Sequence, residues 1–431
     1  MVALVDRLGG WRLAIFLLCE SSEEERERES EREERERESA PFTSLRSHSL
    51  VRSRALSRPH APVTPCERAI HATGQPPINT PSSLTTTRTS TPPRAPSPRI
   101  DDVAATDFET LTSFVMKEHA NQELVVFLNA MQTSLKFIVR AVRKAGIADL
   151  YGLAGTENSS GDDVKKLDLL SDEVMIDCLK KSGACALLVS EEQEEPIVVP
   201  EATRGSLCVA FDPLDGSSNI DCNVSTGTIF SVFQKTSEGE PCAADILKPG
   251  TDMVCAGYCM YGSAIDLCIT FMNGVHRFTL DDSIGEFVYI GPLTFPAKNK
   301  TIYSCNEGNY QLWDANIQQS VELFKNPSDG SKPYSARYVG SMVSDVHRTI
   351  LYGGIFLYPA DKKSTKGKLR LLYEGLPMAS IIEQAGGVAS TGMFQGSVQR
   401  ILDVVPEHIH DRCPIIMGCE RDCSKVLALY D

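Results

Sequence analysis

Hydrophobic positions from about residue 106 onward follow first a helical and then a strand-like spacing. Over 121–146 apolar residues recur every three to four positions, which predicts a long helix that begins after Asn121 and ends at Gly146. A capping box, Thr106-x-x-Glu109, predicts the start of an earlier helix. Further helices are predicted over 163–181, 341–351 and 378–385.

Apolar runs of strand length fill much of the remaining chain. They lie at 185–192, 206–212, 227–233, 253–260, 275–280, 286–290, 301–305 and 353–358. Three helices, a run of strands and then mixed helices and strands predict an α/β fold, an α+β layered sandwich in two lobes.

The first hundred residues have a different composition. Residues 23–38 consist almost wholly of Glu and Arg, and such a tract buries no core. Residues 41–100 are rich in Ser, Thr and Pro, with eight Arg, one acid and no Lys, as in organellar transit peptides. We therefore expect 1–106 to be a disordered or targeting extension. An untargeted extension, a plastid or mitochondrial presequence and a spurious leader all remain open.

Charge and length exclude several classes of protein. The 431 residues carry 43 Lys+Arg and 57 Asp+Glu, a net charge of −14. Of these, 15 basic and 13 acidic residues lie in 1–100, which leaves 28 basic and 44 acidic residues in the body of the protein, residues 101–431. So acidic a body argues against nucleic acid as a partner. No apolar run approaches the roughly 18–20 residues of a membrane span, so no membrane association is expected.

The fourteen cysteines are scattered through apolar runs, which predicts reduced core thiols in a reducing compartment.

The segment Asp212-Pro-Leu-Asp-Gly-Ser-Ser-Asn-Ile-Asp221 carries the strongest chemical signal. Asp212 ends an apolar strand, Pro213 is expected to stop its ladder, and Gly216 permits a tight turn. Two carboxylates three residues apart, with the Leu214 carbonyl between them, suit a hard cation such as Mg²⁺. The alternative is an Asx-type turn with solvated aspartates.

Two further groups of acids strengthen the metal interpretation. Glu191 and Glu192 end another apolar strand, and Asp162 and Asp168 lie at the start of the third predicted helix. Taken singly, these are more often a solvated strand end and helix N-terminal charges. If they converge, they form a two-metal site for phosphoryl transfer, in which water attacks in line.

These motifs resemble the Mg²⁺-dependent, Li⁺-sensitive sugar and inositol phosphatases. Within that superfamily the resemblance to the fructose-1,6-bisphosphatases is close and covers about 107–430. Besides the Asp212 motif it rests on Asn306-Glu-Gly308, Ala336-Arg-Tyr-Val-Gly-Ser-Met-Val343, Asp345-Val-His-Arg348, Gly353-Gly-Ile-Phe-Leu-Tyr-Pro359 and Gly367-Lys-Leu-Arg-Leu-Leu-Tyr-Glu374. It implies the sugar phosphatase fold, with an N-terminal lobe over 107–292 and a C-terminal lobe over 293–431.

The resemblance also implies roles for individual residues. The metal ligands are expected to be Asp162, Glu191, Asp212, the Leu214 carbonyl, Asp215 and Glu374. Glu192 and Asp168 are expected to position the attacking water and take its proton. Asp215, Gly216, Ser217 and Ser218 are expected at the 1-phosphate. The 6-phosphate pocket is expected to include Asn306, Glu307, Gly308, Asn309, Arg337, Tyr338, Val339, Gly340, Ser341, Met342, Tyr358, Lys368, Leu369 and Arg370.

The implied protein is a fructose-1,6-bisphosphate 1-phosphatase with Mg²⁺, or Mn²⁺ or Zn²⁺ as substitutes. It is expected to be a cytosolic homotetramer in which Arg337 reaches into a neighbouring subunit, with the plastid as the alternative location. Rival hypotheses are a sedoheptulose-1,7-bisphosphatase, a non-catalytic sugar-phosphate sensor and an inositol monophosphatase. His347 and Arg348 lie within an apolar helix pattern, so we interpret them as structural or interface residues.

The chain departs from the family pattern at the inhibitory AMP site of animal members. Animal members bind AMP through a Thr-Gly-Glu-Leu-Thr turn, and residues 121–125 stand at that place here. Animal members complete the pocket with a Lys-Tyr pair, where this chain has Ser206-Leu207, and with an Arg, where it has Gln234. We therefore expect weak or no inhibition by AMP. The cysteine-bearing insertion of redox-controlled plastid members is missing from 234–250, and Asn309 replaces a tyrosine of the 6-phosphate pocket.

Overall fold

The computed structural model describes residues 108–118, 121–148, 150–157 and 163–430, without the side chains of 153–157 and 163–164. Thr106, Asp162 and the predicted extension 1–106 lie outside these ranges, so the expectations for them stay predictions.

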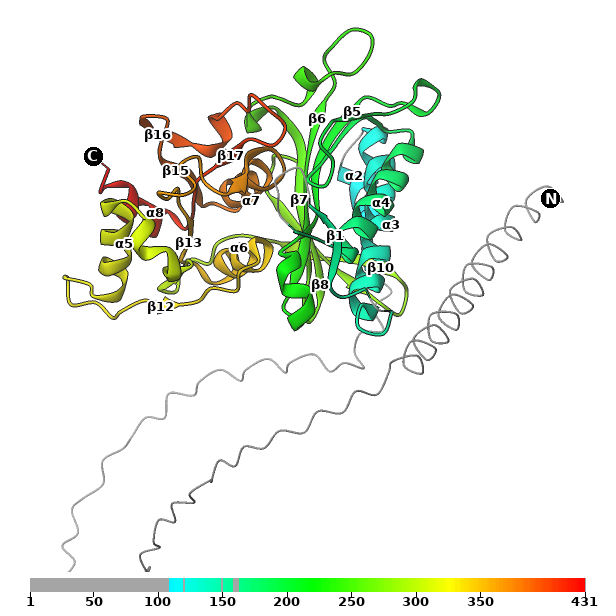
Figure 1. The fold of residues 1–431 in the computed structure, drawn as a ribbon. Coiled ribbons are helices and arrows are strands. Elements are labelled where there is room, and N and C mark those ends of the chain that lie inside the picture. The colour runs from blue at the N-terminus through cyan, green and yellow to red at the C-terminus, as the bar shows by residue number, and fades with distance from the viewer. Residues whose placement is uncertain (1–107, 119–120, 149, 158–162, 431) are drawn as a thin grey trace, which may run out of the picture. The chain divides into compact units, whose positions relative to one another are not determined.

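The first layer of the fold consists of three helices that cover one face of a large sheet (Figure 1). They are α2 (Leu111–Glu118), α3 (Gln122–Lys144) and α4 (Lys166–Ser182). The predicted N-terminus of α3 is confirmed, since the Asn121 side chain accepts a hydrogen bond from the Glu123 amide over 2.9 Å. At the other end the helix stops at Lys144 and Ala145 is the C-cap, so Gly146 occupies the C′ position, as predicted.

Two of the predicted helix starts are displaced. The first helix begins at Leu111, because the Thr110 backbone pairs with Val288 and the Thr110 hydroxyl accepts from the Ser113 amide. The helix predicted over 163–181 begins at Lys166, since the preceding residues form the short strand β2 (Asp163–Lys165), which pairs with β1 (Leu153–Glu157). It ends as expected at Gly183, whose φ of 83° suits a residue without a Cβ.

The second layer is an eight-stranded sheet in the order β10-β9-β8-β7-β6-β5-β3-β4. All pairs are antiparallel except β3 with β5. The strands are β3 (Cys185–Ser190), β4 (Ile197–Val198), β5 (Leu207–Asp215), β6 (Thr226–Gln234), β7 (Met253–Tyr261), β8 (Ile265–Thr270), β9 (Val275–Asp281) and β10 (Glu286–Pro292). The sequence predicted six of them and missed β8 and the two-residue β4.

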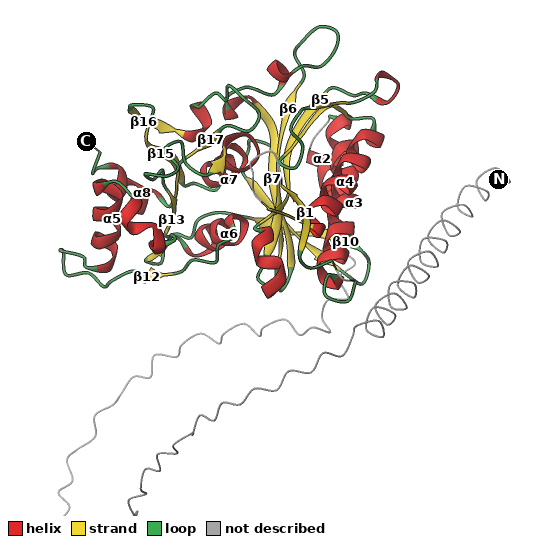
Figure 2. Ribbon diagram, viewed as in Figure 1, coloured by secondary structure: helices red, strands yellow, loops and turns green. Residues whose placement is uncertain are grey.

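Helices α6 (Met342–Tyr352) and α7 (Leu376–Gln384) pack on the other face of this sheet and form the third layer. A six-stranded sheet in the order β12-β11-β13-β18-β15-β16 follows, and α5 (Ala315–Lys325) and α8 (Glu420–Leu427) cover its far side (Figures 1 and 2). Its strands are β11 (Ile302–Ser304), β12 (Ser335–Ala336), β13 (Ile355–Tyr358), β15 (Val388–Phe394), β16 (Ser397–Arg400) and β18 (Ile415–Gly418). The described chain is thus a stack of alternating helix and sheet layers, as expected.

Short elements connect these layers. A two-stranded sheet joins β14 (Leu369–Arg370) to β17 (Arg412–Cys413). Short 3₁₀ helices are η2 (Glu201–Thr203), η3 (Ser217–Cys222), η4 (Ala243–Asp245), η5 (Gly250–Asp252), η6 (Glu307–Leu312) and η8 (Ile401–Asp403), and η7 (Leu371–Gly375) is a π-helical turn.

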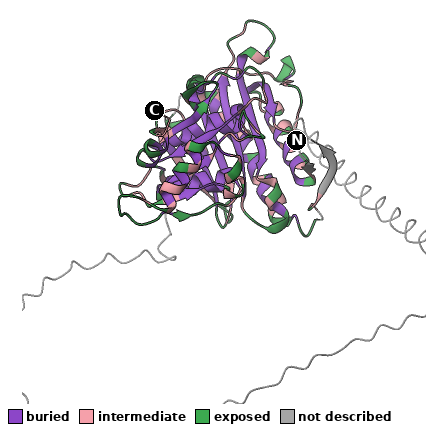
Figure 3. Ribbon diagram, turned by 60° about the vertical axis from the view of Figure 1, so that its left-hand side comes forward, coloured by how far each residue is buried: buried purple, intermediate pink, exposed green. Residues whose placement is uncertain are grey.

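Alternation along the strands fills separate cores on the two faces of the large sheet. On β6, Ile229 and Phe233 face the core shared with α6 and α7, whereas Phe230 and Val232 face the core under α2–α4. A third core lies under α5 and α8 and includes Trp313. Figure 3 shows buried residues concentrated along the strands between these layers.

Among the described helices, α3 alone is long and apolar enough to cross a membrane, in contrast to the expectation from the sequence. Half of its most apolar window is buried inside the protein, including Phe127 and Leu135, both inaccessible to solvent. Core packing therefore accounts for its apolar face.

All twelve described cysteines are free thiols, and nine of them are buried. This agrees with the interpretation of core thiols.

Candidate active site

Three acidic side chains meet at the edge of the large sheet. Asp212 and Asp215 lie at the end of β5, and Glu374 lies in η7, which packs against β5 and β6. One carboxylate oxygen from each lies within 4.8 Å of the others, and all three residues are buried. The hydroxyl of Ser231 on β6 donates to the Leu372 carbonyl over 2.9 Å, which holds η7 against the sheet.

The end of β5 differs from the prediction in a way that builds this cluster. Pro213 does not end the strand: β5 continues to Asp215 through an irregular register, with Asp212 opposite Ile229 and Asp215 opposite Gly227. This β-bulge accommodates a residue without an amide donor, and the Thr228 hydroxyl donates to the Pro213 carbonyl over 2.8 Å. The extra residue lets Asp212 and Asp215 share one side.

Gly216 then turns the chain with a φ of 75°, as predicted. A Cβ at this position would approach the Ser341 Cβ to 2.9 Å, so the turn also requires the smallest residue for close packing. The turn leads into η3, which carries Ser217 and Ser218.

The electrostatics of the cluster favour a bound cation. Burial raises the pKa of Asp212 well above its ordinary range, and the charges of Glu191, Asp215 and Glu374 raise it further. Burial likewise raises the pKa of Glu374, and that of Asp215 to about 6, in each case with a contribution from Glu191. A divalent cation would offset this repulsion, and carboxylate oxygens are the ligands it prefers. The residues present therefore fit a divalent metal.

Glu191 and Glu192 follow β3, next to β5. The Glu191 amide donates to the Phe211 carbonyl over 3.2 Å, which places the two strand ends side by side. Glu191 also lies within electrostatic reach of Asp212, Asp215 and Glu374. The predicted convergence of Glu191 with these three acids is thus observed, while Asp162 lies outside the described residues.

The segment that carries the two glutamates is held by an acid that sequence reasoning missed. The buried Asp172 on α4 accepts hydrogen bonds from the Ser190 hydroxyl and from Nε2 of Gln193, at 2.5 and 2.6 Å. The Glu192 amide in turn donates to the Ser190 hydroxyl. The sequence offered one signal for Asp172, namely a charged residue on the buried side of a predicted helix.

Asp168 lies in the first turn of α4 and is buried. Its Oδ2 accepts from the Lys165 amide over 2.9 Å, and the Ser217 hydroxyl lies next to its carboxylate. Burial raises the pKa of Asp168 to about 6, although these hydrogen bonds oppose the shift. The contact with Ser217 connects Asp168 to the turn that follows Asp215.

A cavity of about 370 Å³ adjoins the cluster. Nine of the predicted site residues line it: Asp215, Ser218, Asn306, Tyr338, Gly340, Met342, Tyr358, Lys368 and Leu369. Burial raises the pKa of Tyr338 and of Tyr358, so both phenols keep their protons at neutral pH and can donate hydrogen bonds. The wall also includes Asn219, Asp345 and Phe356, which were not predicted although each lies within a recognised motif.

Other predicted substrate residues do not line this cavity. The Glu307 carboxylate is held by the Tyr303 hydroxyl and the Lys325 ammonium, at 2.6 and 3.0 Å. Arg337 is exposed, and it lines a different cavity of about 740 Å³ together with Lys298 and Lys300. Also absent from the wall are Gly216, Ser217, Gly308, Asn309, Val339, Ser341 and Arg370.

His347 lies away from the cavity wall. It is buried, and its Nδ1 lies 2.8 Å from the Tyr258 hydroxyl. Burial lowers its pKa to about 4, so it is neutral at pH 7. These contacts agree with its interpretation as a structural residue.

The stacked α/β layers, together with a carboxylate cluster beside a cavity of phenol, amide and ammonium groups, define the class as the sugar phosphatases. Comparisons with known proteins agree. The family model of the fructose-1-6-bisphosphatase N-terminal domain matches residues 109–292, and that of the C-terminal domain matches 296–431. The chain belongs to the fructose-1,6-bisphosphatase family, a family of enzymes, and membership implies a divalent metal.

Individual relatives cover most of the chain. The cytosolic fructose-1,6-bisphosphatase of Arabidopsis thaliana is 52% identical over 335 residues, or 76% of this chain and 96% of the relative. Fructose-1,6-bisphosphatase 1 of Bos taurus is 51% identical over 329 residues, or 75% and 96%. The holo crystal structure of Leishmania major fructose-1,6-bisphosphatase matches with a TM-score of 0.71 and 41% identity, covering 75% of this chain and 99% of that one.

Proposed function

We propose that this protein hydrolyses the 1-phosphate of fructose 1,6-bisphosphate, giving fructose 6-phosphate and inorganic phosphate, in gluconeogenesis and sugar-phosphate metabolism. The observation that carries the proposal is the meeting of Asp212, Asp215 and Glu374 beside the 370 Å³ cavity. Asp215 belongs to both, so a ligand in the cavity lies next to the candidate metal site.

The proposed metal is Mg²⁺, with Mn²⁺ or Zn²⁺ as substitutes. Its ligands would be Glu191, Asp212, the Leu214 carbonyl, Asp215 and Glu374, with Asp162 as a further candidate. When bound, such an ion neutralises phosphate charge and makes water a better nucleophile.

The remaining chemistry falls to side chains. Glu192 and Asp168 are proposed to orient the attacking water and to take its proton as its oxygen bonds to phosphorus and the bond to the sugar oxygen breaks. A pKa of about 6 suits Asp168 to this task, because it is ionised at pH 7 yet basic enough to accept a proton. Ser217 and Ser218, with the amide of Gly216, are proposed to bind the 1-phosphate.

The far end of the cavity is proposed to bind the 6-phosphate. Lys368 supplies a positive charge there, and the phenols of Tyr338 and Tyr358 and the amide of Asn306 supply donors. The other motif residues, Glu307, Gly308, Asn309, Val339, Ser341, Met342, Leu369 and Arg370, would shape this region. We also propose a homotetramer in which Arg337 completes the pocket of a neighbouring subunit, which its exposure supports.

Phosphate release from a panel of substrates tests the proposal. We expect kcat/KM for fructose 1,6-bisphosphate to exceed that for sedoheptulose 1,7-bisphosphate by at least about tenfold, since a site built to hydrogen-bond one substrate discriminates strongly. An inositol monophosphate should be a poor substrate. A preference for the seven-carbon sugar would favour the sedoheptulose alternative, and no hydrolysis of any substrate would favour a non-catalytic sensor.

We propose that the enzyme acts in the cytosol, as the names of its plant relatives support. The plastid remains the alternative. N-terminal sequencing of the protein from its native source tests this, because an imported protein would start well inside residues 1–106.

A further inference from the structure

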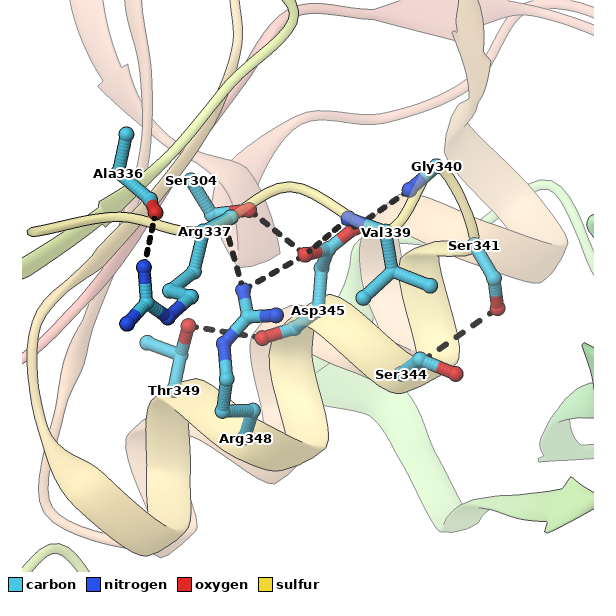
Figure 4. A network of polar contacts seen from close by, with 10 residues as sticks. All are labelled: Ser304, Ala336, Arg337, Val339, Gly340, Ser341, Ser344, Asp345, Arg348 and Thr349. Carbon is cyan, nitrogen blue, oxygen red and sulfur yellow. Dashed lines mark hydrogen bonds and ion pairs between the residues drawn. The ribbon is translucent and has the colours of Figure 1, made fainter. Parts of the chain in front are cut away.

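Asp345 is a buried carboxylate in the first turn of α6 and forms part of the cavity wall. Figure 4 shows donors converging on it from three directions. Oδ1 accepts from the Ser304 hydroxyl at 2.7 Å and from Nη2 of Arg348 at 2.6 Å. Oδ2 accepts from the Gly340 amide at 3.0 Å, and the Val339 amide lies 3.1 Å from both oxygens. Its acceptor sites are therefore used within the protein, and it can hold its neighbours in place.

The neighbours of Asp345 form one side of the cavity. Val339 and Gly340 follow Tyr338, whose ring lines the cavity together with Gly340 itself. Ser304 ends β11, two residues before Asn306, another lining residue. One carboxylate thus connects two segments that each present a polar group to the proposed distal phosphate.

Residues 339–343 form a turn, and its second half is held by Asp215 of the acidic cluster. Oδ2 of Asp215 accepts from the Ser341 hydroxyl at 3.0 Å and from the Val343 amide at 3.1 Å. The turn 339–343 is therefore fixed between two buried carboxylates, Asp215 on one side and Asp345 on the other. With Asp345 removed, the amides of Val339 and Gly340 would lose their acceptor. The turn would keep the bonds to Asp215 and the single hydrogen bond from Nδ2 of Asn219 to the Gly340 carbonyl at 3.1 Å.

The contacts of Asp345 also extend to Arg337. Nη2 of Arg348, which donates to Asp345, donates as well to the Arg337 carbonyl at 2.9 Å (Figure 4). The backbone from Arg337 to Gly340 is thus attached to α6 through Asp345 and its partner Arg348.

We propose that Asp345 is the positioning residue for the end of the substrate that carries the distal phosphate. It holds the 337–340 backbone so that Tyr338 faces the cavity, and it touches no reacting atom. This inference rests on the proposed function, because the ligand being positioned is the 6-phosphate of that substrate.

The test compares wild-type full chain with Asp345→Asn, which keeps the size of the side chain but directs an amide donor at other donors. Calorimetry measures fructose 6-phosphate binding, and kinetics compare fructose 1,6-bisphosphate with fructose 1-phosphate, which lacks the distal group. We expect about tenfold weaker binding and a KM for the bisphosphate raised about tenfold, while kcat and the rate on fructose 1-phosphate change by less than about threefold.

Asp422→Asn is a matched control. Asp422 is also a fully buried acid in the first turn of a helix, α8, and it accepts from the Tyr334 hydroxyl and from Arg421 at 2.8 and 2.7 Å. It does not line the cavity. This variant should lower the melting temperature without changing fructose 6-phosphate binding. Should Asp345→Asn not fold, Ser304→Ala removes a single donor and should weaken binding about twofold to threefold.

Unchanged fructose 6-phosphate binding by a folded Asp345→Asn, or by Ser304→Ala if that variant stands in for it, would overturn the inference and leave the proposed function intact. Equal loss of activity on both substrates would show a general structural role and would also overturn it. If wild-type protein neither binds fructose 6-phosphate nor hydrolyses the bisphosphate, the proposed function fails, and the inference fails with it.

Discussion

The hydroxyl of Ser341 donates a hydrogen bond to Oδ2 of Asp215 over 3.0 Å. Ser341 is the N-cap residue of α6, and its hydroxyl also accepts from the Ser344 amide. The helix that supports the substrate cavity is thus joined at its N-cap to a carboxylate of the acidic cluster. The two halves of the proposed site are therefore built as one unit.

Ser341→Ala should weaken metal binding. The Ser341 hydrogen bond lowers the pKa of Asp215, so its loss raises that pKa above its present value of about 6 and lets protons compete better with the cation. Hydrogen bonds to charged groups contribute about 1.5–3 kcal/mol, so the Mg²⁺ concentration for half-maximal activity at pH 7 should rise about tenfold. Ser320→Ala is the control: this buried serine on α5 donates to the Asn316 carbonyl, away from the cluster. An Mg²⁺ requirement unaffected by Ser341→Ala would refute the assignment of Asp215.

The stabilisation by Mg²⁺ should depend on pH. Without metal, burial raises the pKa of Asp215 to about 6, so this group stabilises the fold fully below its ordinary pKa of 3.8 and loses that contribution as pH rises through 6. A cation favours the ionised form and should restore the lost stability. Thermal unfolding with Mg²⁺ or EDTA should therefore give a larger shift at pH 8 than at pH 5.5, at about 2–4 °C per kcal/mol.

Asp212→Asn provides the comparison for this pH experiment, since Mg²⁺ should change the melting temperature of this variant only slightly at both pH 5.5 and pH 8. A shift in wild-type protein that is larger at pH 5.5 would contradict the assignment of the acidic cluster as the metal site.

Inhibition by AMP should be weak or absent. The residues that stand where animal members bind AMP are bonded to one another here: the Glu123 carboxylate accepts from the amide and hydroxyl of Ser206, and Nε2 of Gln234 donates to that hydroxyl over 2.6 Å. Loss of charged hydrogen bonds at about 1.5–3 kcal/mol each should weaken phosphate binding by orders of magnitude. Millimolar AMP should leave the rate nearly unchanged, with an AMP-sensitive animal member assayed in parallel. Micromolar inhibition would show the expectation to be wrong.

Arg337 should act in a neighbouring subunit. Its side chain is exposed, lies outside its own cavity wall, and donates to the Ala336 carbonyl at 2.8 Å. Arg337→Ala should raise KM about tenfold or more, as expected for loss of a charge-assisted contact, with little change in kcat. Mixed assembly of Arg337→Ala with Glu192→Gln should recover activity, because some cavities would then receive intact groups from both chains. Mixtures no more active than the separate variants would argue against a shared site.

Much of the fold follows from local pattern, and the exceptions have physical causes. The stretch Ile265–Thr270 was missed because Asp266 interrupts its apolar run. In the fold this acid is buried and bonded to Arg277 and Thr279 on β9. Only tertiary pairing makes a charged residue acceptable there, and a single sequence does not display it.

The site residues likewise divide into those that the local sequence indicates and those that only the fold brings together. The spacing of Asp212 and Asp215 pointed to a cation, since two carboxylates three residues apart, with the Leu214 carbonyl between them, suit a hard metal ion. Glu374 was found through the family resemblance, because its own surroundings are an apolar run that packs as a π-helical turn. Asp172 was not predicted, since its partners Ser190 and Gln193 are distant along the chain. Asp345 was not predicted although it lies in a recognised motif, since its link to Ser304 appears only in the fold.

Phosphate release from fructose 1,6-bisphosphate by the purified chain, measured as Mg²⁺ is titrated in and removed with EDTA, tests the central claim most directly. We predict activity that requires the cation and falls by at least about a hundredfold in Glu192→Gln and in Asp212→Ala, the range expected for loss of a general base or a metal ligand. Near wild-type activity in either variant, or full activity in EDTA, would contradict the account.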